Sequence, residues 1–239
     1  TTSWGASTRL IGAVIMTHAD DDGLRLPPAV APSQIVIVPI IREEADKEKV
    51  LSFCEDVARQ CREHHYMGQS LRVRIDTRDQ QSSEKRWSWI RKGAPLILEI
   101  GPRDVDSGSV SVTRRSDIAG KKEILSAADF TARVVDELKA CHKKLYDDAV
   151  VLSAARTRTD VKTLDEFKAY FGTSGDESYN NGQGFVRAGF CGDEAAVADL
   201  LKSMGVTIRC LPFDQANMPD TCVLTGRPAT TVAIFARSY

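Results

Sequence analysis

The feature that most constrains this chain is the alternation of strand-like and helix-like segments between residues 34 and 115. Ile35–Val38 is a continuous β-branched run, as in a strand that is covered on both faces. Residues 43–63 follow with the spacing of an amphipathic helix. The stretch as a whole has the order β-α-β-α-β-β and predicts an α/β domain with a mixed sheet. The apolar stripe of the first helix comprises Val50, Cys54, Val57, Ala58 and Cys61.

The later segments of this stretch have their own signals. Leu71, Val73 and Ile75 alternate with polar residues, which predicts a half-exposed strand. Residues 82–92 predict a short helix that ends before Gly93. The apolar run Pro95–Ile100 predicts a strand, and after a turn at Gly101-Pro102 its hairpin partner is Val110–Thr113.

The segments on either side are simpler. Residues 26–32 contain three prolines and are typical of a linker. Residues 123–150 predict a long helix, because apolar residues recur every three or four positions. Residues 164–171 predict a short helix, and residues 172–184 a polar, Gly-rich loop.

The end of the chain predicts a small α+β unit. Asp193 is placed to cap a helix that ends at Gly205. Residues 206–211 and 231–236 have the composition of strands.

Composition excludes several classes of protein. The 239 residues are 42% hydrophobic and 27% charged, which excludes wholesale disorder and a collagen-like or coiled-coil chain. The longest apolar runs are far shorter than the ~20 residues of a membrane span. The six cysteines are scattered, which favours a reduced, cytosolic compartment. The chain opens with Thr1 and without a signal peptide, which indicates a fragment of a longer protein or, alternatively, a processed N-terminus.

Charge is distributed unevenly along the chain. The net charge is −1, but residues 72–122 hold twelve basic and seven acidic side chains, a local balance of +5. Such asymmetry fits either phosphate contact or a solvated surface with counter-charges elsewhere. Between Arg86 and Lys92 cations alternate with Trp87 and Trp89, a mixture that can stack on unpaired bases and attract phosphates. One of these tryptophans is expected to pack in the core.

Catalytic signatures are missing from the sequence. The histidines are not in a triad spacing, and neither H-E-x-x-H nor a Walker loop occurs, so the chain does not resemble a complete enzyme. Cys191 and Cys222 each stand in a turn-like setting, with Cys210 in a predicted strand nearby. A four-thiolate zinc site needs two C-x2–4-C pairs, so a bound metal is the less favoured interpretation.

Three separated motifs carry a resemblance to a known family. Residues 2–12, with 18–21 and 23–28, resemble motif 3 of prolyl-tRNA synthetase in its eukaryote- and archaea-like class II subgroup. Residues 92–104 (KGAPLILEIGPRD) are similar to the family's K-G-x-P-x-x-x-E-x-G-P-R-D stretch. Gly184-Phe185-Val186, Cys191-Gly192-Asp193, Ile208–Phe213 and Phe235–Tyr239 are similar to that subgroup's C-terminal domain.

The resemblance implies a mixed-sheet α/β anticodon-binding domain over 33–122. Residues 1–32 would be a remnant of the catalytic domain, and 123–239 a connecting helix with a small α+β, zinc-type domain. The parent would be a homodimeric, cytoplasmic ligase that uses ATP and Mg to join proline to tRNA(Pro) through a prolyl-adenylate; the fragment would be mainly monomeric and inactive. Ser7, Thr8 and Arg9 would bind ATP. The terminal carboxylate of Tyr239 would reach the active site. The expected tRNA-binding residues are Arg78, Lys85, Arg86, Trp87, Lys92 and Arg103.

Two departures from the family pattern matter. Ile90 stands where the family has Glu, which removes a base-edge acceptor. Ala196 and Thr225 stand at the second positions of the cysteine pairs, so Cys191 and Cys222 are degenerate zinc positions and zinc is not expected. A non-catalytic tRNA-binding or regulatory paralogue therefore stays open as an alternative, as does a purely structural module.

Overall fold

The computed structural model describes residues 1–117, 120–172 and 184–237. The chain divides into two compact units, an N-terminal unit (Thr1–Ala149) and a C-terminal unit (Val150–Tyr239). Among the described residues no helix has both the length and the apolar character of a membrane span.

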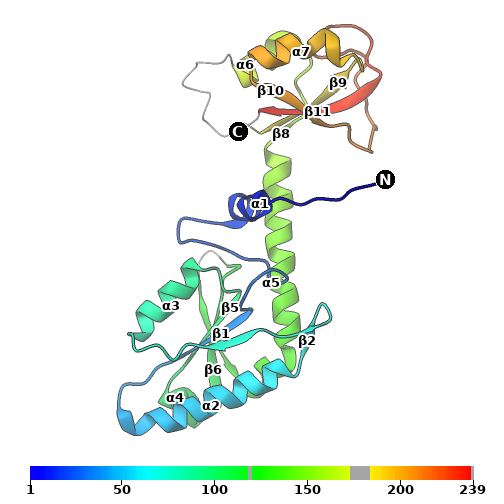
Figure 1. The fold of residues 1–239 in the computed structure, drawn as a ribbon. Coiled ribbons are helices and arrows are strands. Elements are labelled where there is room, and N and C mark those ends of the chain that lie inside the picture. The colour runs from blue at the N-terminus through cyan, green and yellow to red at the C-terminus, as the bar shows by residue number, and fades with distance from the viewer. Residues whose placement is uncertain (118–119, 173–183, 238–239) are drawn as a thin grey trace. The chain divides into compact units, whose positions relative to one another are not determined.

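A mixed sheet with the strand order β4-β1-β5-β6-β7 forms the centre of the N-terminal unit (Figure 1). β1 runs parallel to β4 and β5, because helical crossovers connect them, whereas β6 is antiparallel to β5 and β7. The strands are β1 (Ile35–Pro39), β4 (Val73–Ile75), β5 (Leu96–Ile100), β6 (Ser109–Arg114) and β7 (Lys122–Ser126).

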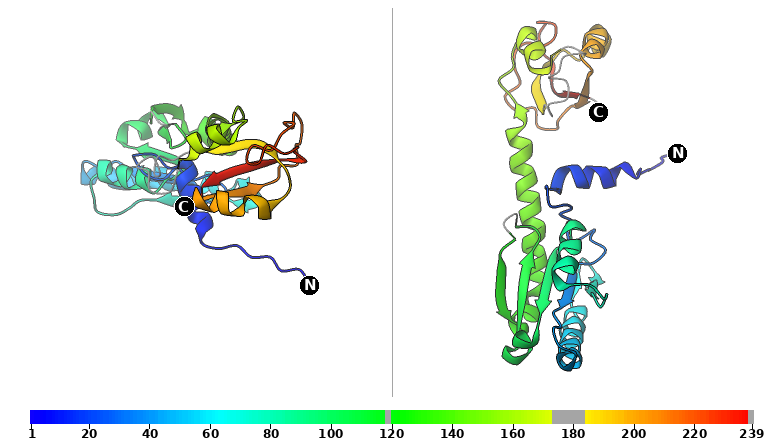
Figure 2. Two further views of the ribbon diagram at one scale, coloured as in Figure 1. Left: turned by 90° about the horizontal axis from the view of Figure 1, so that it is seen from above. Right: turned by 90° about the vertical axis from the view of Figure 1, so that its left-hand side faces the viewer.

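Helices cover both faces of the three parallel strands. Ile35 and Ile37 face one core, which α2 and α5 cover, whereas Val36 and Val38 face a second core under α3. The first half of α5 runs alongside the strands (Figures 1 and 2). This two-sided burial explains why β1 is an unbroken apolar run. The helices are α1 (Arg9–His18), α2 (Glu44–Arg62), α3 (Ser82–Arg91), α4 (Pro102–Ser107) and α5 (Ala127–Ala155), and a small hairpin joins β2 (His65–Tyr66) to β3 (Gln69–Ser70).

The predicted strand–helix order is confirmed for β1, α2, β4, α3, β5 and β6, and the expected stripe of α2 is buried throughout. The expected start of the long helix at residue 123 is wrong: 122–126 form β7, and α5 begins at Ala127. β7 is an edge strand whose Ile124 is exposed, so it lacks the apolar alternation that marks a strand in sequence. The predicted turn after β5 contains the short helix α4, with Asp104 accepting from the Gly101 amide.

The proline-rich segment before β1 is tied to the N-terminal unit. The Arg72 guanidinium donates to the carbonyls of Pro28, Ala29 and Ala31 at 2.9–3.1 Å. Gln34, which is buried, donates to the same Pro28 carbonyl and accepts from the Arg72 amide. One of the twelve basic residues of the positive stretch therefore has a structural role.

The residues before this segment are also fixed. The Leu24 amide donates to the Arg91 carbonyl at the end of α3, and Gly93 passes so close to Leu24 that a Cβ on Gly93 would lie 2.7 Å from the Leu24 Cβ. Arg115, itself buried, forms a two-pronged ion pair with Asp20. The segment that follows α1 is therefore attached to the C-terminal end of α3.

The C-terminal unit has its own sheet, in the order β10-β11-β9-β8, and an aromatic core. Phe167, Phe171 and Phe235 pack with ring centroids 4.8–5.3 Å apart. The predictions of α6, α7, β10 and β11 are confirmed, including the cap that Asp193 places on α7. Residues 173–183 of the predicted loop, and Tyr239, lie outside the described residues. The elements are β8 (Thr157–Arg158), α6 (Leu164–Phe171), β9 (Phe185–Phe190), α7 (Glu194–Ser203), β10 (Val206–Cys210) and β11 (Thr231–Arg237).

Candidate nucleic-acid interface

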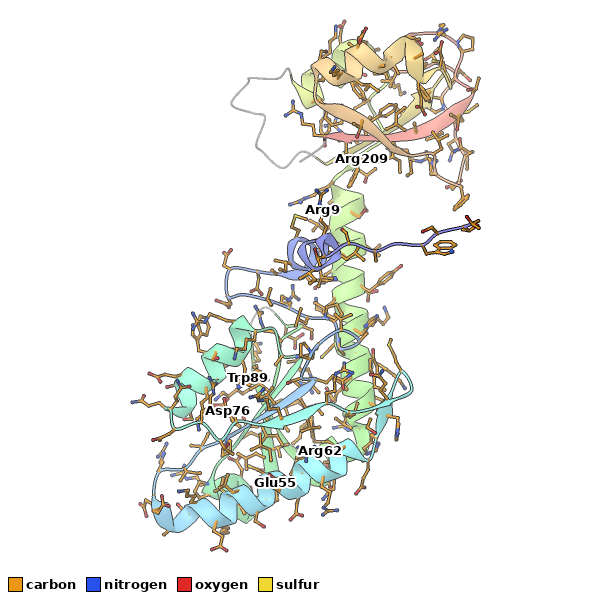
Figure 3. The ribbon with its side chains drawn as sticks, in the orientation of Figure 1. Arg9, Glu55, Arg62, Asp76, Trp89 and Arg209 are labelled. Carbon is orange, nitrogen blue, oxygen red and sulfur yellow. The ribbon has the colours of Figure 1, made fainter. Side chains whose placement is uncertain are left out.

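The site begins with a buried carboxylate that joins β4 to α3. Asp76 follows β4 and is 2% exposed. It accepts from Trp89 Nε1 at 2.6 Å and from the Arg78 guanidinium at 2.6 and 2.8 Å (Figure 3). The Arg78 hydrogen bond, aided by the Trp89 bond and opposed by burial, holds the pKa of Asp76 far below its usual range. The carboxylate is therefore charged at neutral pH, and it fixes both partners in place.

Three cations surround the ring of Trp89. Lys92 Nζ lies 4.6 Å from the ring centroid, and the guanidinium carbons of Arg74 and Arg78 lie 5.3 and 5.9 Å away. Trp89 is 6% exposed, which confirms that one tryptophan of the pair packs in the core. Its ring is therefore not available to stack on a base, but it concentrates positive charge beside β4.

A cleft of about 710 Å³ lies next to this cluster, at the carboxyl ends of β1 and β4. Ligands of open α/β sheets bind at such strand ends. Arg78 and Lys85 line the cleft together with Arg42 and Lys47, but Glu43, Glu44 and Asp79 line it as well. The charge of the cleft is therefore mixed.

A second polar group lies on the β5 side of α3. Glu99 is 6% exposed, and its Oε2 lies 2.6 Å from Lys122 Nζ and 3.2 Å from Arg86 Nε. Among the described residues Oε2 has no partner with hydrogen-bond geometry, and the same holds for Thr113 Oγ1. The pairing of β5 with β6 puts Thr113 opposite Ile97, on the sheet face that Glu99 shares. Both atoms are buried, so they could accept from or donate to a base only after a covering side chain, such as that of the half-exposed Lys122, moves aside.

The predicted tRNA-binding residues do not form one patch. Trp87 is 43% exposed and Lys92 is exposed, so both are accessible. Lys85 is 8% exposed, and Arg86 is held at Glu99 on the other side of α3. Arg103 is exposed on α4, which packs against α2 rather than α3.

Sequence reasoning missed the two carboxylates. Glu99 had a signal, since a charge inside the apolar run of β5 requires partners. Asp76 had no such signal in the sequence, because polar residues commonly follow strands. Ile90 lies in α3 and is buried, so its side chain faces the core between this helix and the sheet.

The expected ATP-binding residues lie before and at the start of α1. Ser7, Thr8 and Arg9 are exposed, and α1 has no buried residue. The Ser7 hydroxyl accepts from the Arg9 amide at 3.3 Å. The structure places the three side by side, on a helix without a packed face.

The residues around Cys191 and Cys222 do not fit a tetrahedral zinc ion. The Arg227 guanidinium lies 3.4 Å from Cys191 Sγ and 3.0 Å from an Asp193 oxygen. Within the described ranges no three His, Cys, Asp or Glu side chains are grouped to hold a metal. Two thiols, with the Arg227 cation beside one of them, are not the set of four ligands that zinc requires.

The sheet order and the cations beside α3 indicate that the N-terminal unit is an α/β domain that binds nucleic acid. Residues 34–146 match the family described as "Anticodon binding domain". Residues 176–239 match the family described as "Prolyl-tRNA synthetase, C-terminal".

Curated relatives agree along the whole chain. It is 46% identical over 239 residues to a proline–tRNA ligase of Paramagnetospirillum magneticum, covering 100% of this chain and 46% of the relative. It is 42% identical to that of Protochlamydia amoebophila and 41% identical to "Proline–tRNA ligase 2" of Anaeromyxobacter dehalogenans, covering 47% of each. The chain thus carries the anticodon-binding and C-terminal domains of proline–tRNA ligases, which confirms the resemblance at that level. It spans about half the length of these relatives.

Proposed function

We propose that this chain is the tRNA-binding portion of a proline–tRNA ligase that uses ATP and Mg to attach proline to tRNA(Pro) through a prolyl-adenylate. The observation that carries the proposal is the anticodon-binding domain over residues 34–146, within a chain that aligns along its full length with proline–tRNA ligases. The parent enzyme of this proposal is a cytoplasmic homodimer of the eukaryote- and archaea-like subgroup, as the sequence motifs at residues 2–28 and 184–239 imply.

The chain by itself does not activate proline in this proposal. Ser7, Thr8 and Arg9 are exposed at the start of α1, where a guanidinium could clamp ATP only within a larger site. The carboxylate of Tyr239 completes that site from the C-terminus. The domains are those expected from the sequence, 1–32, 33–122 and 123–239, with the last one free of zinc. An ATP–pyrophosphate exchange assay on the chain tests this: proline-dependent exchange would contradict it.

The tRNA surface of this proposal is the exposed side of α3, next to the buried Glu99 of β5. Trp87 stacks on an unpaired base, since its ring is accessible and rises from a cationic helix. Lys92 and Arg78 attract phosphates beside Trp89. Glu99, with Arg86 beside it, supplies the base-edge acceptor that Ile90 does not, once the half-exposed Lys122 that pairs with it moves aside.

The experiment compares binding of two proline tRNA transcripts, one with its natural anticodon and one with the anticodon guanines replaced, across a salt series. We expect the replaced transcript to bind about tenfold more weakly at every salt concentration, the effect of about 1.4 kcal/mol of lost base reading. Equal and steeply salt-dependent binding of both would mean phosphate attraction alone, and would favour the non-catalytic paralogue.

Two variants test which residue recognises the anticodon bases. Glu99→Gln should abolish the difference between the transcripts, because the amide offers one acceptor instead of a carboxylate. Glu84→Gln is the matched control, since Glu84 is exposed in the first turn of α3. If both variants kept full discrimination, base reading would lie elsewhere in the chain.

A further inference from the structure

The free thiols of Cys191 and Cys222 lie near each other at the edge of the core of the C-terminal unit. Cys191 directly follows β9 and is partly exposed, whereas Cys222 is 1% exposed. The Val223 amide donates to the Gly189 carbonyl at 3.0 Å, which places Cys222, the residue before Val223, beside the end of β9 and Cys191. One accessible thiol therefore lies near one that solvent does not reach.

Cys222 begins a turn over residues 222–227, and this turn also carries the cation Arg227. The Cys222 amide donates to the Arg227 carbonyl at 2.8 Å, and the Gly226 amide donates to the Cys222 carbonyl at 2.9 Å, which closes the turn. The Arg227 guanidinium reaches back across it to Cys191 Sγ, and Asp193 holds the guanidinium there. A guanidinium beside a thiol stabilises its thiolate, the form that reacts with oxidants.

The other cysteines lack this arrangement. Cys54, Cys61 and Cys141 are buried in the N-terminal unit, and burial raises the pKa of the Cys54 and Cys61 thiols to about 12. Cys210 is exposed on β10 and serves as an internal control for accessibility alone.

We propose that Cys191 and Cys222 are a redox pair that peroxides convert reversibly to a disulfide. The Cys191 thiolate attacks one peroxide oxygen, so that an S–O bond forms, the O–O bond breaks and one water leaves after protonation. The Cys222 sulfur then attacks Cys191; the S–S bond forms, the S–O bond breaks, and the departing hydroxide takes the Cys222 proton as a second water. The two thiols lose two electrons to the peroxide, and a dithiol reductant restores them.

The consequence lies in the turn that carries Arg227. The disulfide removes the Cys191 thiolate from beside the guanidinium, which keeps Asp193 as its partner, and links residue 191 covalently to the turn at 222–227. The unit then carries an oxidation-dependent cross-link near the start of α7. This inference does not depend on the proposed tRNA binding.

The test treats the reduced chain with hydrogen peroxide and maps its thiols and disulfides by peptide mass spectrometry. We expect a 191–222 disulfide as the first product, at an unchanged rate in Cys210→Ser. In Cys222→Ser a sulfenic acid at Cys191 should persist and react with dimedone. Oxidation of Cys210 before Cys191, or a pair that stays reduced, would overturn the proposal.

A second variant separates chemistry from folding. Arg227→Gln should slow peroxide oxidation of Cys191 about tenfold, since the cation that favours the thiolate is lost. Diamide should still form the 191–222 disulfide in this variant, which shows that the two sulfurs remain adjacent. An unchanged peroxide rate in a variant that still forms the disulfide with diamide would refute the role of Arg227.

Discussion

Replacing Asp76 with Asn should unfold the N-terminal unit at a markedly lower urea concentration. The carboxylate receives two charge-assisted contacts on one oxygen, from Trp89 Nε1 and the Arg78 guanidinium, and a third from Arg78 Nε on the other. Asparagine keeps only one acceptor oxygen. Its NH2 group would therefore face N–H donors, either Arg78 Nε or the pair Arg78 Nη2 and Trp89 Nε1. At about 1.5 kcal/mol for each charge-assisted bond, and with Arg78 partly screened by solvent, the loss is about 2–4 kcal/mol.

Tryptophan fluorescence is the assay, because all three tryptophans lie in the N-terminal unit. With a urea m value of about 2 kcal/mol/M, the midpoint should fall by about 1–2 M. Asp79→Asn is the matched control, since Asp79 is exposed close to Asp76. A midpoint shift no larger than that of the control would refute the reasoning that this carboxylate holds β4 and α3 together.

The same variant has a defined pH dependence. The folded-state pKa of Asp76 is depressed, so its stabilisation is present above the unfolded-state pKa of about 3.9 and is lost as the pH falls toward the folded value. The difference between the natural chain and Asp76→Asn should therefore be constant at pH 5–7 and shrink below about pH 4. A difference that grew on acidification would contradict the sign of the shift.

Three further outcomes are expected. Gly93→Ala should lower the urea midpoint of the same fluorescence transition by more than Gly68→Ala: both glycines have φ above +70°, but only at Gly93 does a Cβ meet another chain segment, at a cost of about 2–4 kcal/mol against about 1 kcal/mol. Thr163→Ala should remove the capping box with Glu166 and speed hydrogen exchange in α6 by about fivefold, which corresponds to about 1 kcal/mol. Trp87→Ala should weaken binding of both tRNA transcripts at least fivefold, with Trp4→Ala, a substitution of a still more exposed ring, as the control.

The candidate site was only partly readable in the sequence. The interleaved cations and tryptophans pointed to α3, and α3 indeed carries the exposed Trp87, with Lys92 as its C-cap. The pattern did not reveal that Arg86 pairs with Glu99 and that Lys85 is nearly buried, since both contacts depend on which side of the helix meets the sheet. Residues one position apart in this helix consequently belong to different surroundings.

By itself the sequence determined the local elements whose burial repeats with a regular period. The unbroken β1 run, the stripe of α2 and the capped start of α7 are local patterns, because each depends on residues a few positions apart. Only the tertiary structure decided which charges meet. In the N-terminal unit, the crossovers place β4 beside β1 and α3 over both, which brings Asp76 to Trp89. In the C-terminal unit, the pairing of β9 with β11 brings Cys191 near the turn that carries Arg227. These partners are 13 and 36 positions apart, so their contact is a property of the folded chain rather than of any local pattern.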